Sequence, residues 1–191
     1  MGGAVPKQFL DIDGKPILAM TLEVFERCGA VDGVYLVVPE RNVDFCRREI
    51  VEAFGFEKVA GVVPGGETRL ESVRLGMEAA AGFDFVVVHD GVRPLVTSKL
   101  IQEVLEAARK GGAATAAVQA RDTVKEVENG LVRRTFDRRK IWLAQTPQAF
   151  QYTVLMDAHQ WAEKNSRNDF TDDASVVEGT GAAVAVVPGD E

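Results

Sequence analysis

The sequence predicts an α/β fold in which a mostly parallel, twisted sheet is flanked by helices. Short apolar, β-branched runs, typical of strands buried on both faces, alternate along the chain with segments of helical periodicity. Strands that alternate with helices are joined by crossover connections, which align the strands in one direction. The composition agrees, because 46% of the 191 residues are hydrophobic and 27% are charged, the balance of a globular chain that can bury a full core.

The first two thirds of the chain carry this alternation most clearly. Residues 1–10 resemble the end of a loop, and Pro16 suits the first position of a helix that extends to residue 28. The predicted elements that follow are a strand at 34–39, a polar helix containing Phe45, Ile50 and Phe54, a strand at 58–63, a helix at 70–81, a strand at 85–88, a helix at 98–109 and a strand at 113–118.

The pattern then changes to a hairpin. Residues 122–128 and 131–136 alternate in polarity around Asn129-Gly130, a strong two-residue turn signal. Large apolar residues are few on both faces, so we predict a projecting arm at about 121–140 that packs against another subunit. Residues 142–150 lead into a helix at 152–163, another helix begins at 171–173, and a last strand covers 182–187. We expect residues 1–191 to form a single domain.

The net charge of −7 argues against nucleic acid or an anionic membrane surface as a partner, since both need a basic surface. No apolar run approaches the ~20 residues of a membrane span. We therefore expect a cytoplasmic protein with neither kind of partner. Cys28 and Cys46 lack paired or metal-ligand spacing and are expected to be buried, reduced thiols.

Two stretches are candidate sites. The strand at 85–88 ends in His89, Asp90, Gly91 and Arg93, and ligands of open α/β sheets bind beyond the carboxyl ends of strands. An aspartate there can hold a metal ion and an arginine a phosphate, although an Asp-Gly turn with a surface arginine explains the same residues.

The second stretch is Gly65-Gly66, which stands directly before the helix at 70–81. The two glycines let the backbone approach a ligand closely, the first helical N–H groups can bind an anion, and Ser72 adds a hydroxyl. A glycine turn before an ordinary capped helix is the alternative interpretation.

Taken together, several motifs follow one another in a characteristic order. They are Pro6-Lys7-Gln8-Phe9, Gly14-Lys15-Pro16, Gly65-Gly66 with Arg69 and Ser72-Val73, His89-Asp90 with Arg93-Pro94, Asp122-Thr123 with Lys125, Asp137-Arg138, Gln145-Thr146-Pro147-Gln148 and Thr171-Asp172-Asp173-Ala174-Ser175. With these motifs the whole chain resembles the 2-C-methyl-D-erythritol 4-phosphate cytidylyltransferase family of the non-mevalonate isoprenoid pathway. The resemblance implies a Rossmann-like fold of the nucleotidyltransferase type. It also implies a reaction of CTP with 2-C-methyl-D-erythritol 4-phosphate that gives 4-diphosphocytidyl-2-C-methylerythritol and pyrophosphate.

The chain departs from the family pattern in three places. The family begins with a strand and a glycine-rich loop carrying an arginine, of which Met1-Gly2 resembles the last piece, and it continues beyond Gly189-Asp190 into a further segment. We therefore expect these residues to be part of a longer protein, and the sequence does not decide whether a cyclase domain follows. Gly91-Val92 stands where the family usually has two alanines.

The resemblance also implies roles for individual residues. Lys7 is the candidate catalytic residue, expected to stabilise the pentacoordinate phosphorus, and Asp90 is the candidate ligand of Mg²⁺ or another divalent cation. The expected CTP-binding residues are Gly2, Lys7, Gly65, Gly66, Glu67, Ser72, Asp90 and Gly91. The residues expected to hold the substrate phosphate are Arg93, Thr123, Arg138, Thr146 and Thr171. Arg138, at the base of the arm, resembles a residue that reaches into the partner's site, which implies a homodimer.

Other polar residues receive structural interpretations. The attacking phosphate is already ionised, so His89 is expected to be a strand-end histidine satisfied by the backbone, and His159 a surface residue. Asp172 and Asp173 are expected to supply helix N-terminal charge. Each threonine, taken alone, is equally well explained as a helix or turn cap. Two other functions remain as alternatives, a ribitol 5-phosphate cytidylyltransferase and a non-catalytic nucleotide-binding protein without the glycine-rich loop.

Overall fold

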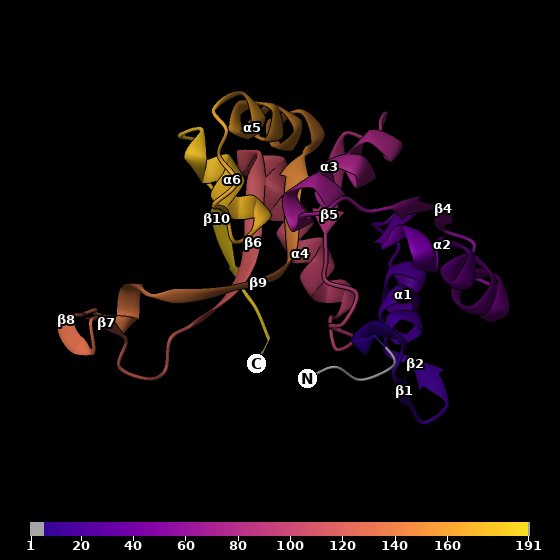
Figure 1. Ribbon diagram of the computed structural model, residues 1–191, viewed down its shortest axis with the longest axis horizontal. Helices are drawn as coiled ribbons and strands as arrows, with labels where there is room; N and C mark the ends of the chain where they lie inside the picture. Colours follow the sequence, from indigo (N-terminus) through magenta and orange to yellow (C-terminus); the bar gives the residue numbers. More distant parts are fainter. Residues whose placement is uncertain (1–5, 191) are drawn as a thin grey trace.

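A computed structural model describes residues 6–190 and places a four-stranded sheet at the centre of the molecule (Figure 1). The strand order is β10-β6-β9-β5. The bounds of these strands are Phe85–Val88 for β5, Ala113–Gln119 for β6, Trp142–Gln151 for β9 and Ala185–Pro188 for β10. Strand β10 is parallel to β6, and β9 is antiparallel to both β5 and β6. Three of the four strands therefore share one direction, which confirms the predicted α/β fold.

Strand β9 is the reversed strand, and the sequence pattern did not reveal it. Residues 142–150 were expected only to lead into a helix, and the polar middle of this segment contains Pro147, which argues against a central strand. The structure accommodates Pro147 at an irregularity in the ladder, since Gln148 pairs with Thr115 whereas Ala144 pairs with Ala117. Residues 145–147 thus lie opposite a single residue of β6, a bulge at which proline is tolerated.

Helices cover both faces of this sheet. Helix α4 (Ser98–Gly111) packs on one face, where Ala114 and Ala149 are buried with its Leu100 and Val104. Helices α5 (Tyr152–Lys164) and α6 (Asp173–Gly179) pack on the other face, and the neighbouring residue Phe150 is buried there. Successive strand residues point to opposite faces, so β9 contributes to both cores.

A second, two-stranded parallel sheet pairs β3 (Val34–Val38) with β4 (Val59–Pro64). Helix α1 (Ile17–Arg27) packs against it through Leu18 and Leu22, which are buried with Leu36 and Val38. Helix α3 (Arg69–Ala79) follows β4 and packs closely against β3. A Cβ on its Gly76 would lie 2.7 Å from Cγ2 of Val37. The remaining elements that precede β4 in the chain are η1 (Lys7–Phe9), β1 (Asp11–Ile12), β2 (Lys15–Pro16), η2 (Glu40–Asn42), α2 (Val43–Phe45) and the π-helix η3 (Cys46–Glu52).

The predicted hairpin projects from the central sheet as an arm (Figure 1). It consists of β7 (Lys125–Glu128) and β8 (Leu131–Thr135), and every residue of both strands is exposed. The short helix η4 (Arg138–Lys140) returns the chain to β9. Within residues 6–190, no helix combines the length and the apolar character that crossing a membrane requires.

Candidate functional site

The two-stranded sheet and the central sheet are separated by a cleft of about 720 Å³. Strands β3 and β5 form its walls, and α3 contributes one side. Three of the predicted site residues line this cleft, namely Ser72, Asp90 and Gly91, together with His89 and Arg69. The two stretches that the sequence singled out separately, at the ends of β4 and β5, therefore meet at one place.

The loop after β5 is held in a defined shape by short polar contacts. The Nε of Arg93 donates to Oδ2 of Asp90 at 2.9 Å, and both side chains are partly exposed. The backbone N–H of Asp90 donates to Oγ1 of Thr146 at 3.2 Å. Thr146 lies on β9, so the reversed strand brings one predicted substrate-binding residue directly against the predicted metal ligand.

His89 behaves as the sequence predicted. Its Nε2 lies 3.2 Å from the backbone oxygen of Arg93, and its Nδ1 is buried without a hydrogen-bond partner in the described residues. Burial lowers the pKa of His89, although the contact with the Arg93 carbonyl and the charge of Asp90 oppose that effect. Burial therefore favours the neutral form of the His89 imidazole at neutral pH.

Residues 65–68, which we call the glycine loop, form a tight loop directly before α3. The N–H of Gly66 donates to Oγ of Ser72 at 3.1 Å, and that hydroxyl donates in turn to the Thr68 carbonyl at 2.9 Å. The side chain of Thr68 caps α3 by accepting from the N–H of Glu71. A Cβ on Gly65 would lie 2.8 Å from Oγ of Ser72, so a larger residue at this position would displace the hydroxyl.

Arg69 and Asp173 form an ion pair that the sequence did not reveal. One guanidinium nitrogen of Arg69 lies 2.7 Å from Oδ2 of Asp173, whose side chain is completely buried. Burial raises the pKa of Asp173, and the hydrogen bond from Arg69 opposes that rise. Burial alone would lower the pKa of Arg69, but Asp173, Asp90 and Asp172 together raise it. A signal was available, because Asp173 lies on the same helical face as the apolar Val176 and Val177.

The expectation for Asp172 holds, whereas that for His159 was wrong. Asp172 caps α6 in a capping box with Ser175. His159 is 3% exposed rather than at the surface, because it shares the buried face of α5 with Leu155, Ala158 and Ala162. Burial, followed by the charges of Arg74 and Arg69, lowers the pKa of His159 to about 4.

The remaining predicted residues do not line the cleft in the described part of the chain. Lys7 is exposed in η1, next to Gln8, which lines the cleft. Thr171 is exposed directly before α6, Glu67 is exposed in the glycine loop, and Thr123 is exposed at the base of the arm. Gly2 lies outside the described residues.

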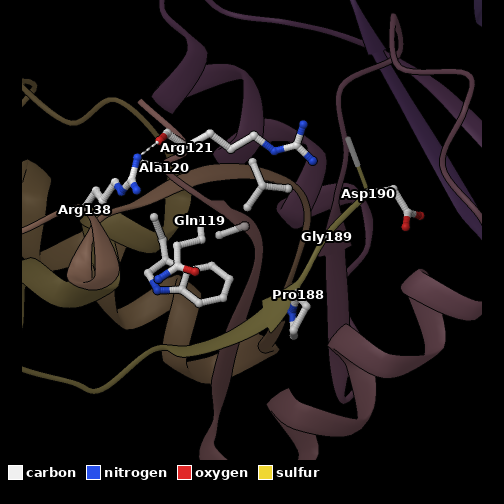
Figure 2. Close-up of a pocket in the computed structure, with 10 residues that line it drawn as sticks. Gln119, Ala120, Arg121, Arg138, Pro188, Gly189 and Asp190 are labelled. Atoms are coloured by element: carbon white, nitrogen blue, oxygen red, sulfur yellow. Dashed lines mark hydrogen bonds between the residues drawn. The ribbon is translucent and has the colours of Figure 1, made fainter. Parts of the chain in front are cut away.

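Arg138 lines a separate hollow of about 700 Å³ at the base of the arm (Figure 2). One of its guanidinium nitrogens donates to the backbone oxygen of Arg121 at 2.6 Å. The hollow is bounded by the ends of β6 and β10, including Gln119, Pro188 and Asp190. Of the described residues that line it, Arg138 is the only predicted site residue.

The whole chain matches one known family. The family-level match, described as 2-C-methyl-D-erythritol 4-phosphate cytidylyltransferase (IspD), covers residues 1–191. The chain belongs to the 2-C-methyl-D-erythritol 4-phosphate cytidylyltransferase family. It is therefore a nucleotidyltransferase, and its reaction is that of CTP with 2-C-methyl-D-erythritol 4-phosphate in isoprenoid precursor synthesis.

Individual members of the family support this assignment. The chain is 46% identical to the 2-C-methyl-D-erythritol 4-phosphate cytidylyltransferase of Geobacter metallireducens, over 100% of this chain and 83% of that one. It is 50% identical to the bifunctional enzyme IspD/IspF of Desulforudis audaxviator, over 99% of this chain and 48% of that protein. The cytidylyltransferase structure from Thermus thermophilus superposes with a TM-score of 0.76 at 34% identity, over 97% of this chain and 84% of that one.

Proposed function

We propose that the cleft between β3 and β5 binds CTP and that the end of β5 and the middle of β9 bind the methylerythritol phosphate. The observation that carries this proposal is the hydrogen bond between Asp90 and Thr146, which joins the loop after β5, at the wall of the cleft, to β9. A phosphate oxygen of the second substrate attacks the α-phosphorus of CTP in line, and pyrophosphate leaves with the electron pair of the broken P–O bond. Catalysis then depends mainly on positioning and on neutralising charge.

Lys7 is assigned the task of neutralising charge on the transferring phosphoryl group. Its side chain is exposed and its neighbour Gln8 lines the cleft, which leaves the ammonium available to a bound triphosphate. The glycine loop is assigned to cytosine and ribose through Gly66, Glu67 and Ser72, and Gly65 and Gly91 are also assigned to CTP. Backbone donors and acceptors in such a loop match the amino and carbonyl edge of a pyrimidine.

Asp90 is the proposed ligand of Mg²⁺. Within residues 6–190, no group of three or more His, Cys, Asp or Glu side chains is placed to hold a metal ion. A single partly exposed carboxylate nevertheless suits Mg²⁺, which usually combines one or two carboxylates with substrate phosphates and water. The bound ion would supply positive charge to the phosphates of CTP.

The arm is proposed to complete the site of a second subunit. Val127, Leu131 and Val132 expose 57%, 68% and 59% of their surfaces on it, and a second copy of the chain would cover them. Figure 1 shows the arm projecting on the opposite side of the central sheet from α1 and β4, so Arg138 is better placed to act in trans. Arg93, Thr146 and Thr171 hold the substrate phosphate from within the chain, with Thr123 at the base of the arm. The protein is proposed to act in the cytoplasm.

The experiment is an assay of pyrophosphate release from CTP by the full-length protein. We expect turnover with 2-C-methyl-D-erythritol 4-phosphate and none with ribitol 5-phosphate. Turnover with ribitol 5-phosphate alone would transfer the assignment to that second substrate. CTP binding without pyrophosphate release from either substrate would instead support the non-catalytic alternative.

A further inference from the structure

The ion pair between Arg69 and Asp173 joins two helix N-termini that carry different halves of the proposed site. Arg69 is the first residue of α3, directly after the glycine loop, and Asp173 is the first residue of α6, directly after Thr171 and Asp172. The two residues lie 104 positions apart in the sequence and 2.7 Å apart in the structure. The glycine loop and the segment that contains Thr171 are thus held together by the ion pair, in which the Asp173 side chain is completely buried.

Gln148 continues this connection from α6 to β9. Its amide nitrogen lies 2.8 Å from Oδ2 of Asp172, and its amide oxygen accepts from the N–H of Ala174 at 3.0 Å. Two residues earlier on β9, Thr146 accepts the backbone N–H of Asp90. A continuous polar chain therefore runs from the glycine loop through α3, α6 and β9 to the proposed metal ligand.

Each half of the site has its own local bonds. The glycine loop is held by Ser72 and Thr68, and the start of α6 is held by the capping box of Asp172 and Ser175. Loss of the ion pair would therefore leave each half intact while changing how the two halves are placed relative to each other. In-line attack is sensitive to such placement, because a misplacement of about 1 Å can slow a reaction about 100-fold.

We propose that Arg69 and Asp173 are positioning residues that fix the nucleotide half of the site against the sugar-phosphate half. This inference rests on the function proposed above. It predicts that the pair acts on the rate of transfer and little on the binding of each substrate alone.

The test compares Arg69→Met, Asp173→Asn and the double variant in the full-length protein. We expect each single variant to lower kcat by about 10- to 100-fold, with the dissociation constant for CTP alone and the KM for methylerythritol phosphate changed by no more than a few-fold. The double variant should lose little more than the worse single variant, because both changes remove the same interaction. Arg69→Lys, which keeps the charge, should recover part of the loss.

The matched control is Arg74→Met, which removes an exposed ion pair with Glu78 on the same helix. Its kcat should equal that of the unchanged protein. Additive losses in the double variant would overturn the proposal, because they would show that the two residues act independently. Losses explained by a smaller folded fraction in thermal unfolding would overturn it in favour of a purely structural pair. A weaker CTP affinity in Arg69→Met but not in Asp173→Asn would make Arg69 a direct ligand instead. Inactivity of the unchanged protein would contradict the proposed function and not this pairing.

Discussion

At the scale of single residues, His159 is a neutral histidine on the buried face of α5. Its Nε2 has no hydrogen-bond partner within the described residues, and its pKa of about 4 lies below the usual 6.5. Between these two values the unfolded chain binds a proton that the folded chain excludes. Protonation therefore favours unfolding, and stability is lost as the pH falls from 6.5 towards 4.

The corresponding prediction concerns His159→Leu. The shift in pKa amounts to about 3 kcal/mol of unfolding free energy at the low end of this range. We expect the unchanged protein to lose up to that amount between pH 7 and pH 4 relative to the variant, which has no group to protonate there. Urea unfolding of both proteins at several pH values measures the difference, and parallel pH profiles would contradict the prediction.

Lys7 is the residue on which the proposed chemistry depends most. We expect Lys7→Ala to reduce kcat by about 100-fold or more, because a charge that stabilises the transition state is lost. The dissociation constant for CTP should rise much less, since other groups hold the base and ribose. Lys99→Ala, at an exposed position on α4, is the control. An unchanged kcat in the Lys7 variant would remove its catalytic role.

Asp90 gives a prediction about metal dependence. Chelation by EDTA should abolish turnover, and added Mg²⁺ should restore it. Asp90→Asn should require a higher Mg²⁺ concentration for half-maximal activity and should show a lower kcat at saturation. Asp84→Asn, just before the other end of β5, should keep the normal requirement. Full activity in EDTA would contradict the metal proposal.

At the scale of elements, the glycine loop before α3 depends on close approach. A Cβ at position 65 would push against the Ser72 hydroxyl and disturb its hydrogen bond to Gly66. We therefore expect Gly65→Ala to raise the KM for CTP more than the KM for methylerythritol phosphate. Steady-state kinetics in each substrate distinguish the two effects. Gly29→Ala is the control, because a Cβ there meets no atom within 4 Å.

The elements also show what a sequence pattern can and cannot reveal. The strand at 85–88 and the helix at 98–109 were predictable, because one has a continuous apolar run and the other has its apolar residues on one face. Strand β9 was not, because its middle is polar and contains Pro147. Its place in the sheet depends on a bulge opposite β6, which is a tertiary feature.

In the candidate site too, some residues could be predicted from the sequence, whereas the contacts between distant segments could not. Asp90, Arg93 and the glycine loop could be predicted, since each directly follows an apolar strand. The contact of Asp90 with Thr146 and the contact of Arg69 with Asp173 could not, because their partners come from segments 56 and 104 residues away. Only packing brings such partners together.

At the scale of the whole molecule, the arm predicts that the active unit is a dimer. Light scattering at micromolar concentration should give twice the mass of the chain. Mixing Lys7→Ala chains with Arg138→Ala chains tests whether Arg138 acts in trans. Each mixed dimer would then hold one intact site, so an equal mixture should recover about one quarter of normal activity.

The outcome of the mixing experiment separates two arrangements. If Arg138 served its own chain, a mixed dimer would contain no intact site, and activity would stay at the level of the single variants. Arg139→Ala is the matched control, because Arg139 lies next to Arg138 and its guanidinium pairs with Asp137. That variant should be active without mixing. A monomer in light scattering would remove Arg138 from the site.

The two ends of the arm enter neighbouring strands, since Gln119 of β6 pairs with Trp142 of β9. Backbone bonds close the base, with the N–H of Ala120 donating to the Ile141 carbonyl at 2.9 Å. The arm is therefore continuous with β9, the strand that carries Thr146 and Gln148. We expect a small molecule or antibody fragment that bends the arm to displace these residues and to lower the rate of transfer.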